Sequence, residues 1–292
     1  MDIRQLSYFI EVAKLKSFTK ASQSLHLSQP TLSKMVKNLE EEVGMELLDR
    51  SARQSELTDA GEIVFIQGEK ILNMLDELSI LLHDMENLKK GKIKIGLPPL
   101  IGILFFPQII KGFQEIYPDI TINLVEHGAN KVIQMVEDGL LDFGVVILPV
   151  DESKFDITPF ASEELMLFVH YSHPLASKKE VSIYDVKNQP IILFNEDFTL
   201  HNRIIQECTN SGFSPTVAYE SSQWDFISDM VGNNLGIAFF PQSITKKINQ
   251  ESIKAIPINP TIPWNLAIIL KKGKYVSHAT NAFLEYISSV PL

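Results

Sequence analysis

The spacing of apolar side chains changes at residues 89–92, and this change limits the possible fold more than any other feature of the chain. Before it, apolar residues recur at the three- and four-residue intervals of amphipathic helices. After it, strand-like runs such as residues 93–97 alternate with helical patterns. Such alternation is typical of α/β domains. The sequence therefore predicts a helical N-terminal unit, a hinge, and an α/β unit with a mainly parallel sheet.

Three short helices are predicted before residue 50, each preceded by a residue type that caps helix N-termini. The capping residues are Asp2, Ser17 or Thr19, and Ser28, and Pro30 is tolerated in the first turn of the third helix. Three helices in so short a segment indicate a helix-turn-helix. The side chains predicted to be buried are Leu6, Phe9, Ile10, Ala13, Ala21, Leu25, Leu32, Val36 and Leu39.

The net charge of −10 argues at first against a nucleic-acid partner, because phosphate contacts need cations. The charge is unevenly distributed, however. Residues 1–57 carry eight basic and eight acidic side chains, so the rest of the chain carries the whole excess of acid. Between Glu11 and Glu40 every charged side chain is a lysine. This asymmetry predicts one DNA-facing module attached to an acidic body.

The exposed face of the third predicted helix carries no carboxylate. Gln29, Ser33 and Lys37 recur at four-residue intervals with Lys34 beside them, and their amide, hydroxyl and ammonium groups suit base edges and phosphates. The alternative is an ordinary solvated helix face. Farther along, two arginines, Arg50 and Arg53, stand between short apolar runs, as at the tip of a β-hairpin wing that reaches a minor groove. A winged helix-turn-helix is predicted over residues 1–58.

A long helix is predicted from Thr58 to about residue 89. One apolar position repeats every seven residues, and Gly68 and two leucines fill the positions between. This pattern predicts a dimerisation helix over residues 59–90, while the alternative is a helix packed on its own domain. The predicted seam residues are Val64, Ile71, Leu75, Leu78, Leu82 and Met85.

Enzyme and metal chemistry find no support in the sequence. His170 and His173 lack further ligands at metal-site spacing, and no nucleophile elbow, phosphate loop or dinucleotide fingerprint occurs, so neither catalysis nor a metal nor a cofactor is predicted. The single cysteine, Cys208, fits a buried, inert thiol better than a redox role. Because no signal peptide or membrane span is evident, a cytoplasmic protein without a membrane partner is expected.

Several motifs along the chain together carry a family resemblance. LSYFIEVA at 6–13, SFTKA at 17–21, LSQPTLS at 27–33, LLDR at 47–50 and LTDAG at 57–61 resemble, in order and spacing, the DNA-binding domain of LysR-type transcriptional regulators. GLLDFGV at 139–145, HPLA at 173–176 and GIAFFP at 236–241 are similar to that family's effector domain, which has the two-lobed fold of type 2 periplasmic binding proteins. Residues 96–102 are similar to the CidR-like branch of the family.

The resemblance implies an effector-responsive activator that binds double-stranded DNA at an imperfect inverted repeat in a promoter and works with RNA polymerase. It implies a dimer that assembles into a homotetramer. The alternative is a solute-binding or transport receptor with no transcriptional role. The residues expected nearest the bases are Gln29, Pro30, Thr31, Ser33 and Lys34, and those expected at phosphates are Lys20, Ser28 and Lys37.

The resemblance also implies an effector-binding domain over residues 91–292, with lobe I at 92–161 and 267–292 and lobe II at 162–266. Helix N-termini that open onto the cleft between the lobes favour anions, so a small carboxylate is the expected effector. Candidate contacts, each of which could instead be structural, are Pro99, Leu100, His127, Gly128, Thr199, His201, Ser221 and Ser222. The chain departs from the family at Asn234, where glycine is usual, and at Pro99 and Leu100, where many members offer a hydroxyl.

Overall fold

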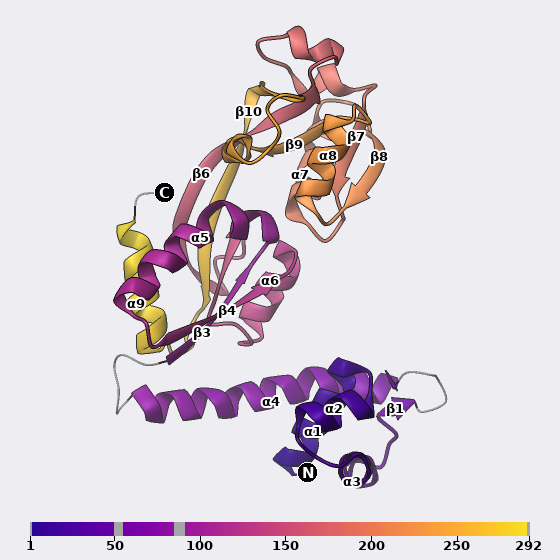
Figure 1. The fold of residues 1–292 in the computed structure, drawn as a ribbon, viewed down its shortest axis with the longest axis vertical. Coiled ribbons are helices and arrows are strands. Elements are labelled where there is room, and N and C mark those ends of the chain that lie inside the picture. Colours follow the sequence, from indigo (N-terminus) through magenta and orange to yellow (C-terminus); the bar gives the residue numbers. More distant parts are fainter. Residues whose placement is uncertain (1, 50–54, 85–90, 291–292) are drawn as a thin grey trace. The chain divides into compact units, whose positions relative to one another are not determined.

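The computed structural model describes residues 2–49, 55–84 and 91–290. Contacts between residues divide the chain into two compact units, Met1–Glu86 and Asn87–Leu292 (Figure 1). In its described part the first unit is helical apart from one short hairpin, and the second mixes strands and helices. Among the described residues, no helix is both long enough and apolar enough to cross a membrane.

The first unit begins with the three predicted helices, α1 (Ile3–Leu15), α2 (Phe18–Ser24) and α3 (Gln29–Val43). Asp2 and Gln5 form a capping box at the start of α1. The Ser17 and Ser28 hydroxyl oxygens each accept a backbone N–H at 3.3 Å in the first turns of α2 and α3. The α3 helix ends at Gly44, whose φ of 74° favours glycine. Local capping chemistry therefore sets the beginning of each helix.

The core of this unit forms from the apolar faces that the helical spacing predicts. Each fully buried aliphatic or aromatic side chain of this kind contributes about 1.5–3 kcal/mol to folding. Leu25 lies at the edge of the core, half-buried. The fully buried members are Leu6, Phe9, Ile10, Val12, Ala21, Leu32, Val36, Leu39, Leu47 and Leu48.

A two-stranded antiparallel hairpin follows α3, with β1 (Leu48–Asp49) paired to β2 (Glu56–Leu57). The buried Glu40 carboxylate positions it, because its Oε1 accepts the backbone N–H groups of Leu47 at 3.0 Å and Leu48 at 3.2 Å. Sequence reasoning missed this role, because Leu47 and Leu48 lie seven and eight residues beyond Glu40. The two wing arginines, Arg50 and Arg53, lie outside the described residues.

The long helix α4 (Asp59–Asp84) begins where the sequence predicts it. The Thr58 hydroxyl accepts the Gly61 N–H at 3.0 Å and donates to the Glu46 carbonyl at 2.7 Å, so it joins the helix start to the hairpin. A Cβ atom at Gly61 would lie 2.0 Å from the Leu47 carbonyl oxygen, which explains why glycine stands there.

The second unit, shown in Figure 1, is built on a six-stranded sheet; its strand order is β4-β3-β5-β10-β6-β9. Strand β3 is parallel to β4 and β5, whereas β10 is antiparallel to β5 and β6, and β9 is antiparallel to β6. The α/β class is confirmed, but the expectation of a mainly parallel sheet is wrong. The strands are β3 (Gly91–Leu97), β4 (Ile120–Glu126), β5 (Phe143–Ile147), β6 (Phe155–His170), β9 (Ala238–Pro241) and β10 (Ile253–Lys271).

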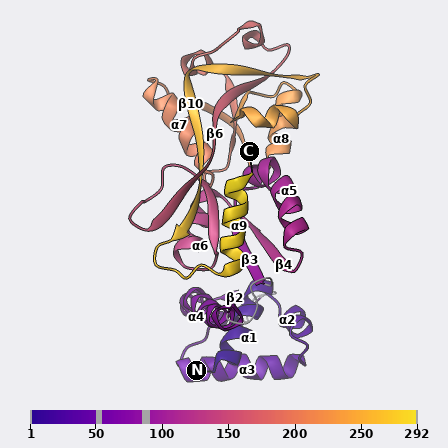
Figure 2. The ribbon, with the colours of Figure 1, turned by 90° about the vertical axis from the view of Figure 1, so that its left-hand side faces the viewer.

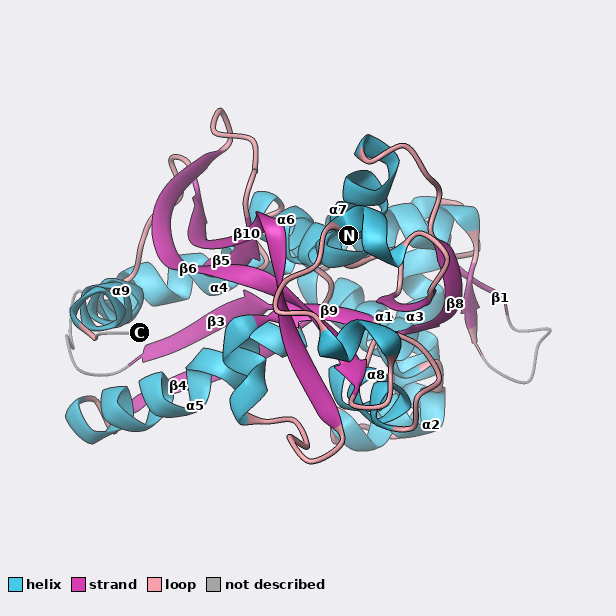
Figure 3. Cartoon of the chain, turned by 90° about the horizontal axis from the view of Figure 1, so that it is seen from above, coloured by secondary structure: helices cyan, strands magenta, loops and turns pink. Residues whose placement is uncertain are grey.

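Helices cover both faces of the β3-β4-β5 part of this sheet, which with them forms lobe I (Figure 3). Helices α5 (Pro99–Ile116) and α9 (His278–Ser289) pack together on one face, and α6 (Ala129–Glu137) packs on the other. Lobe II contains the parallel pair β7 (Pro190–Phe194) and β8 (Thr216–Ser221), with α7 (Thr199–Asn210) and α8 (Trp224–Gly232). Three short 3₁₀ helices also lie in this unit: Pro174–Ser177, Ile183–Val186 and Gln242–Lys246.

Two long strands, β6 and β10, run antiparallel from lobe I into lobe II (Figure 2). The sequence predicts only the end of β6 and the end of β10. Prolines interrupt the apolar alternation earlier in β10, where the pairing register shifts between Pro257 and Ile262. These return strands are antiparallel to their neighbours in lobe I, which is why the sheet is mixed.

Candidate functional site

The solvent face of α3 presents the side chains predicted to read DNA. Gln29, Thr31, Lys34 and Lys37 are exposed and Ser33 is half-buried. The Ser28 and Thr31 hydroxyls share a 2.7 Å hydrogen bond within the cap, so both also serve the helix start. Among the described residues, the polar atoms of the Gln29 and Lys34 side chains have no hydrogen-bond or ion-pair partner. These two side chains are therefore free to meet a ligand.

Two further lysines complete the cationic surface of this unit. Lys20 is exposed on α2. Lys37 forms an exposed ion pair with Glu41 at 3.5 Å, one turn farther along α3. Exposed pairs of this kind contribute little free energy, so a phosphate can replace the carboxylate at small cost. Pro30 is exposed in the first turn, as predicted.

The residues of the α4 heptad pattern lie on two different surfaces of the helix. Val64 packs half-buried against the core of its own unit, and a Cβ at Gly68 would lie 2.8 Å from Leu6, so this stretch faces α1. Leu75 is half-buried. Leu78 is 53% exposed and Ile71 37% exposed. Met85 lies outside the described residues, as does the side chain of Leu82.

Three exposed apolar side chains of α4 were not predicted as seam residues: Ile63, Ile66 and Met74, the last of them 62% exposed. With Ile71 and Leu78 they form what we call the α4 stripe. It lies on the side of the helix that does not pack on α1 and has no covering element in the described part of this unit. A helix that is apolar on two sides has a second surface to bury.

The N-termini of four helices in the second unit lack a side-chain cap. The N-cap residues are Pro98 for α5, Gly128 for α6, Phe198 for α7 and Gln223 for α8, and none of these four side chains accepts an N–H of the first turn. In α8 the Asp225 carboxylate accepts the Phe226 N–H at 3.0 Å. By contrast, Ser277 caps α9. Uncapped N-termini leave backbone donors and the positive end of the helix dipole available to an anion.

Three of these N-termini meet at a small cavity between the lobes, which we call the inter-lobe cavity. Its volume is about 20 Å³, roughly the space of one water molecule. Trp264, on the crossing strand β10, also lines it. Lobe I contributes Pro98, Leu100, Ile101, Ala129 and Ile147, and lobe II contributes Phe194, Phe198, Thr199 and Leu200.

The structure brings together only some of the predicted effector residues. Leu100 and Thr199 line the inter-lobe cavity, and Pro99 begins α5 beside it. A Cβ at Gly128 would lie 2.4 Å from the Asp197 carbonyl oxygen, so glycine here lets the two lobes touch. Sequence reasoning missed Phe194, which precedes Thr199 by five residues, and Trp264, which is far from the predicted contacts in sequence; both carry only an apolar signal.

The other four candidates have structural surroundings. His201 is buried, with its Nε2 3.1 Å from Glu220 and its Nδ1 3.3 Å from Asn202. The Ser221 hydroxyl accepts the Gln223 N–H at 3.1 Å. His127 and Ser222 are exposed and do not line the cavity.

Comparison with known proteins decides the family. Residues 3–62 match the model of the bacterial regulatory helix-turn-helix protein of the lysR family, and residues 86–291 match the LysR substrate binding domain. The chain belongs to the LysR family of transcriptional regulators. It is 53% identical over 290 residues to the uncharacterized HTH-type transcriptional regulator YwbI of Bacillus subtilis (strain 168), covering 99% of this chain and 96% of that protein.

More distant relatives agree with this assignment. The regulator is 32% identical to the HTH-type transcriptional regulator AlsR of Bacillus subtilis (strain 168), over 85% of this chain and 83% of that protein. Full-length CbnR in complex with its target DNA has the same fold, with a TM-score of 0.74 at 22% identity and 99% of both chains covered. The regulator is thus a DNA-binding protein with an effector-binding domain, not an enzyme, and the receptor alternative is wrong. The CidR-like placement stays a prediction.

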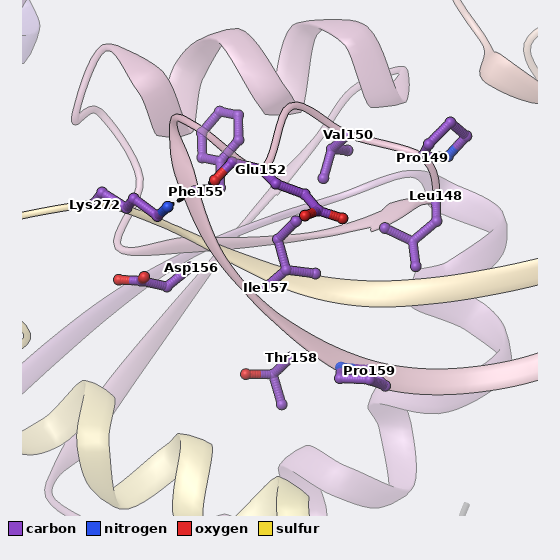
Figure 4. A pocket seen from close by; sticks show the side chains of 10 residues that line it. All are labelled: Leu148, Pro149, Val150, Glu152, Phe155, Asp156, Ile157, Thr158, Pro159 and Lys272. Carbon is purple, nitrogen blue, oxygen red and sulfur yellow. Dashed lines mark hydrogen bonds between the residues drawn. The ribbon is translucent and has the colours of Figure 1, made fainter.

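A larger groove, of about 590 Å³, lies on lobe I away from the inter-lobe cavity (Figure 4). It is formed by the loop after β5 and the start of β6, and none of the predicted effector residues lines it. Its lysine, Lys272, donates to the Glu152 carbonyl oxygen at 2.7 Å, while the Asp156 carboxylate points away from that pair.

The single thiol of the regulator is expected to be unreactive in the folded state. Burial raises the pKa of Cys208 to about 11, so very little thiolate exists near neutral pH. An ordinary thiol in the unfolded chain titrates near pH 8.5, so the folded state retains the proton longer and the free energy of unfolding should fall from about pH 9 to about pH 11. Labelling with a thiol reagent at pH 7.5 checks the first point, and Cys208→Ala, which should remove this part of the pH dependence, checks the second. Rapid labelling of the native protein would contradict the burial.

Proposed function

We propose that the regulator binds an imperfect inverted repeat in promoter DNA through α3. The observation that carries this proposal is the first part of α3, residues 29–38, which contains no carboxylate and presents the exposed Gln29 and Lys34 beside the half-buried Ser33 on a capped helix in a winged helix-turn-helix. A helix of this kind enters the major groove with its N-terminal residues at the bases. Pro30 and Thr31 lie in the same first turn, while Ser28, Lys20 and Lys37 supply phosphate contacts, with Arg50 and Arg53 reaching the minor groove from the wing.

The second part of the proposal is assembly through α4. A two-fold repeat in DNA matches a two-fold protein dimer, and the α4 stripe offers an apolar surface for a second copy. Two such dimers form the homotetramer. The DNA-bound assembly works in the cytoplasm and activates transcription by contacting RNA polymerase.

The third part is control by a small organic acid in the inter-lobe cavity. The uncapped N-termini of α5, α6 and α7 converge there, and no acidic side chain lines the cavity to repel an anion. Because the cavity has room for about one water, an acid that enters it changes the spacing of the lobes. An effector that binds one spacing better shifts the population of the regulator toward it.

A footprinting experiment tests the proposal. The full-length regulator is incubated with the promoter DNA next to its gene, alone and with acetate, butyrate, succinate or benzoate, and sodium chloride serves as the ionic control. We expect protection of two half-sites about one helical turn apart, and a changed pattern with at least one acid and not with chloride. Protection that lacks a repeat would contradict the DNA proposal, and a pattern identical under all five salts would contradict the acid effector.

A further inference from the structure

The two lobes meet at a close contact between Gly128, the N-cap of α6, and the backbone of Asp197, which lies just before α7. A Cβ atom on residue 128 would lie 2.4 Å from the Asp197 carbonyl oxygen and 3.0 Å from the carbonyl carbon. Side chains can rotate out of such a clash, whereas a backbone carbonyl cannot. Any residue other than glycine at position 128 would therefore push Asp197 away from lobe I.

The backbone conformation of Gly128 does not itself require glycine. Its φ of −58° and ψ of 153° lie in a region that every L-residue adopts. Serine, threonine, asparagine and aspartate are favoured at an N-cap because their side chains accept an N–H of the first turn. Glycine gives up that hydrogen bond at the start of α6. The close approach of Asp197 is therefore the structural reason for glycine here.

The turn that carries Asp197 is fixed to lobe II. The Phe198 N–H donates to the Asn195 carbonyl at 3.0 Å, and the Asn195 N–H donates to the Ser221 carbonyl at the end of β8 at 3.2 Å. The Phe198 ring stacks on Phe194 of β7, with ring centroids 5.2 Å apart and an interplanar angle of 29°. A clash at Asp197 therefore acts on lobe II and not on a free loop.

The surroundings of this contact are apolar. Ala129 and Phe198, the neighbours of the two contacting residues in sequence, both line the inter-lobe cavity, which exposes only apolar surface and has room for about one water. Burial of apolar side chains favours the closed contact. An organic acid contains several times as many heavy atoms as one water molecule. The lobes must therefore separate before an organic acid can enter between them.

We infer that Gly128, Asp197 and Phe198 form a latch, the inter-lobe latch, which holds the lobes in contact and which an effector must open. The contact does not depend on the chemistry of the effector, while its role in control rests on the proposed effector site between the lobes. An effector that binds only the separated lobes shifts the population toward them, and the stability of the latch lowers its apparent affinity. A substitution that opens the latch imitates the effector.

The test opens the latch with Gly128→Ser and observes Trp264. Serine is a preferred N-cap, so α6 should keep its start while the added Cβ meets Asp197. Trp264 is 2% exposed, lines the cavity and stacks on Phe105 of lobe I with ring centroids 6.4 Å apart. With Trp224→Phe in the background, Trp264 is the only indole. Acrylamide should then quench its emission at least about threefold more strongly in Gly128→Ser, because the quencher reaches the ring when the lobes part.

The matched control is Gly232→Ser at the end of α8. Its added Cβ would lie 3.2 Å from the Ser252 hydroxyl, a side-chain atom of lobe II, so the lobes should stay in contact and the quenching should equal that of the parent protein. In the absence of any acid, Gly128→Ser should also change the footprint of the full-length regulator on its promoter, whereas Gly232→Ser should not.

Equal quenching in Gly128→Ser and Gly232→Ser would overturn the latch. If Gly128→Ser fails to fold, Phe198→Ala is used with the same readout, because it weakens the contact from lobe II and leaves Gly128 unchanged. Raised quenching with the parent footprint would overturn the role of the latch in control. Raised quenching and a changed footprint, in a regulator that responds to none of the four acids, would support the latch and contradict only the acid effector.

Discussion

Replacing Ser33 and Lys34 together with alanine is expected to lower the affinity of the regulator for its inverted repeat by at least about 100-fold. Each good base contact discriminates by about 1–3 kcal/mol, and a dimer loses the contact in both half-sites. Alanine is the best helix former, so α3 itself should persist. Footprinting and fluorescence anisotropy at several salt concentrations measure the loss. The dependence of affinity on salt should also weaken if Lys34 contacts a phosphate.

The matched control is Lys111→Ala, which removes one exposed lysine from α5 in the effector unit. Lys111→Ala changes the net charge by the same amount as the Ser33 and Lys34 double variant. It should leave the affinity for the repeat within about twofold of that of the parent protein. If the Ser33 and Lys34 double variant still protects the same bases at the same concentration, α3 is not the recognition helix. Equal losses in both variants would instead indicate a general charge effect.

Most of the N-terminal unit can be predicted from the sequence because its determinants are local. Asp2, Ser17, Ser28 and Thr58 cap their helices within three residues of themselves, and the buried faces follow helical spacing. The positive φ of Asn234, 58°, can be anticipated in the same way, since asparagine tolerates this backbone region best after glycine. Glu40 is the exception, because its partners Leu47 and Leu48 lie seven and eight residues away.

The effector unit is less predictable because its site is assembled from distant segments. The helix N-termini can be located from the sequence, and Leu100 and Thr199, which lie at two of them, line the inter-lobe cavity. Trp264 comes from a strand that is interrupted by prolines, and its neighbour Phe105 is about 160 residues away in sequence, so only folding brings the two together. The position of His201 at a helix start predicted a ligand contact, but its ring nitrogen Nε2 instead hydrogen-bonds to Glu220 on the neighbouring strand.

The α4 helix shows how one sequence pattern can serve two surfaces. A strict seven-residue repeat drifts around a helix that has 3.6 residues per turn. At its beginning, the repeat therefore faces the core of its own unit, where Val64 and Gly68 pack near α1. Farther along, Ile71 and Leu78 are exposed beside Met74. The interpretation as a helix packed on its own domain therefore holds for the first part of α4, and the dimer seam stays a prediction for the exposed part.

Replacing Met74 and Leu78 together with aspartate is therefore expected to break the dimer. Both side chains are more than half exposed, so the change should leave the folded unit intact, whereas Val64→Asp would disrupt its core. Burial of each apolar side chain at a seam is worth about 1.5–3 kcal/mol, and a symmetric dimer loses each one twice. Four added carboxylates also repel one another across the seam. The dimer dissociation constant should rise by at least about 1,000-fold.

Light scattering and sedimentation at micromolar concentration measure this change, since the chain itself has a mass of 33.0 kDa. The matched control is Tyr171→Asp, which replaces another half-exposed large side chain with a carboxylate, this time in the effector unit. Its assembly mass should equal that of the parent protein. An unchanged mass in the Met74 and Leu78 variant would show that the α4 stripe does not pair. A lower mass with a retained circular dichroism spectrum, together with weaker protection of the repeat, would link the two-fold assembly to recognition, because one recognition helix reads only one half-site.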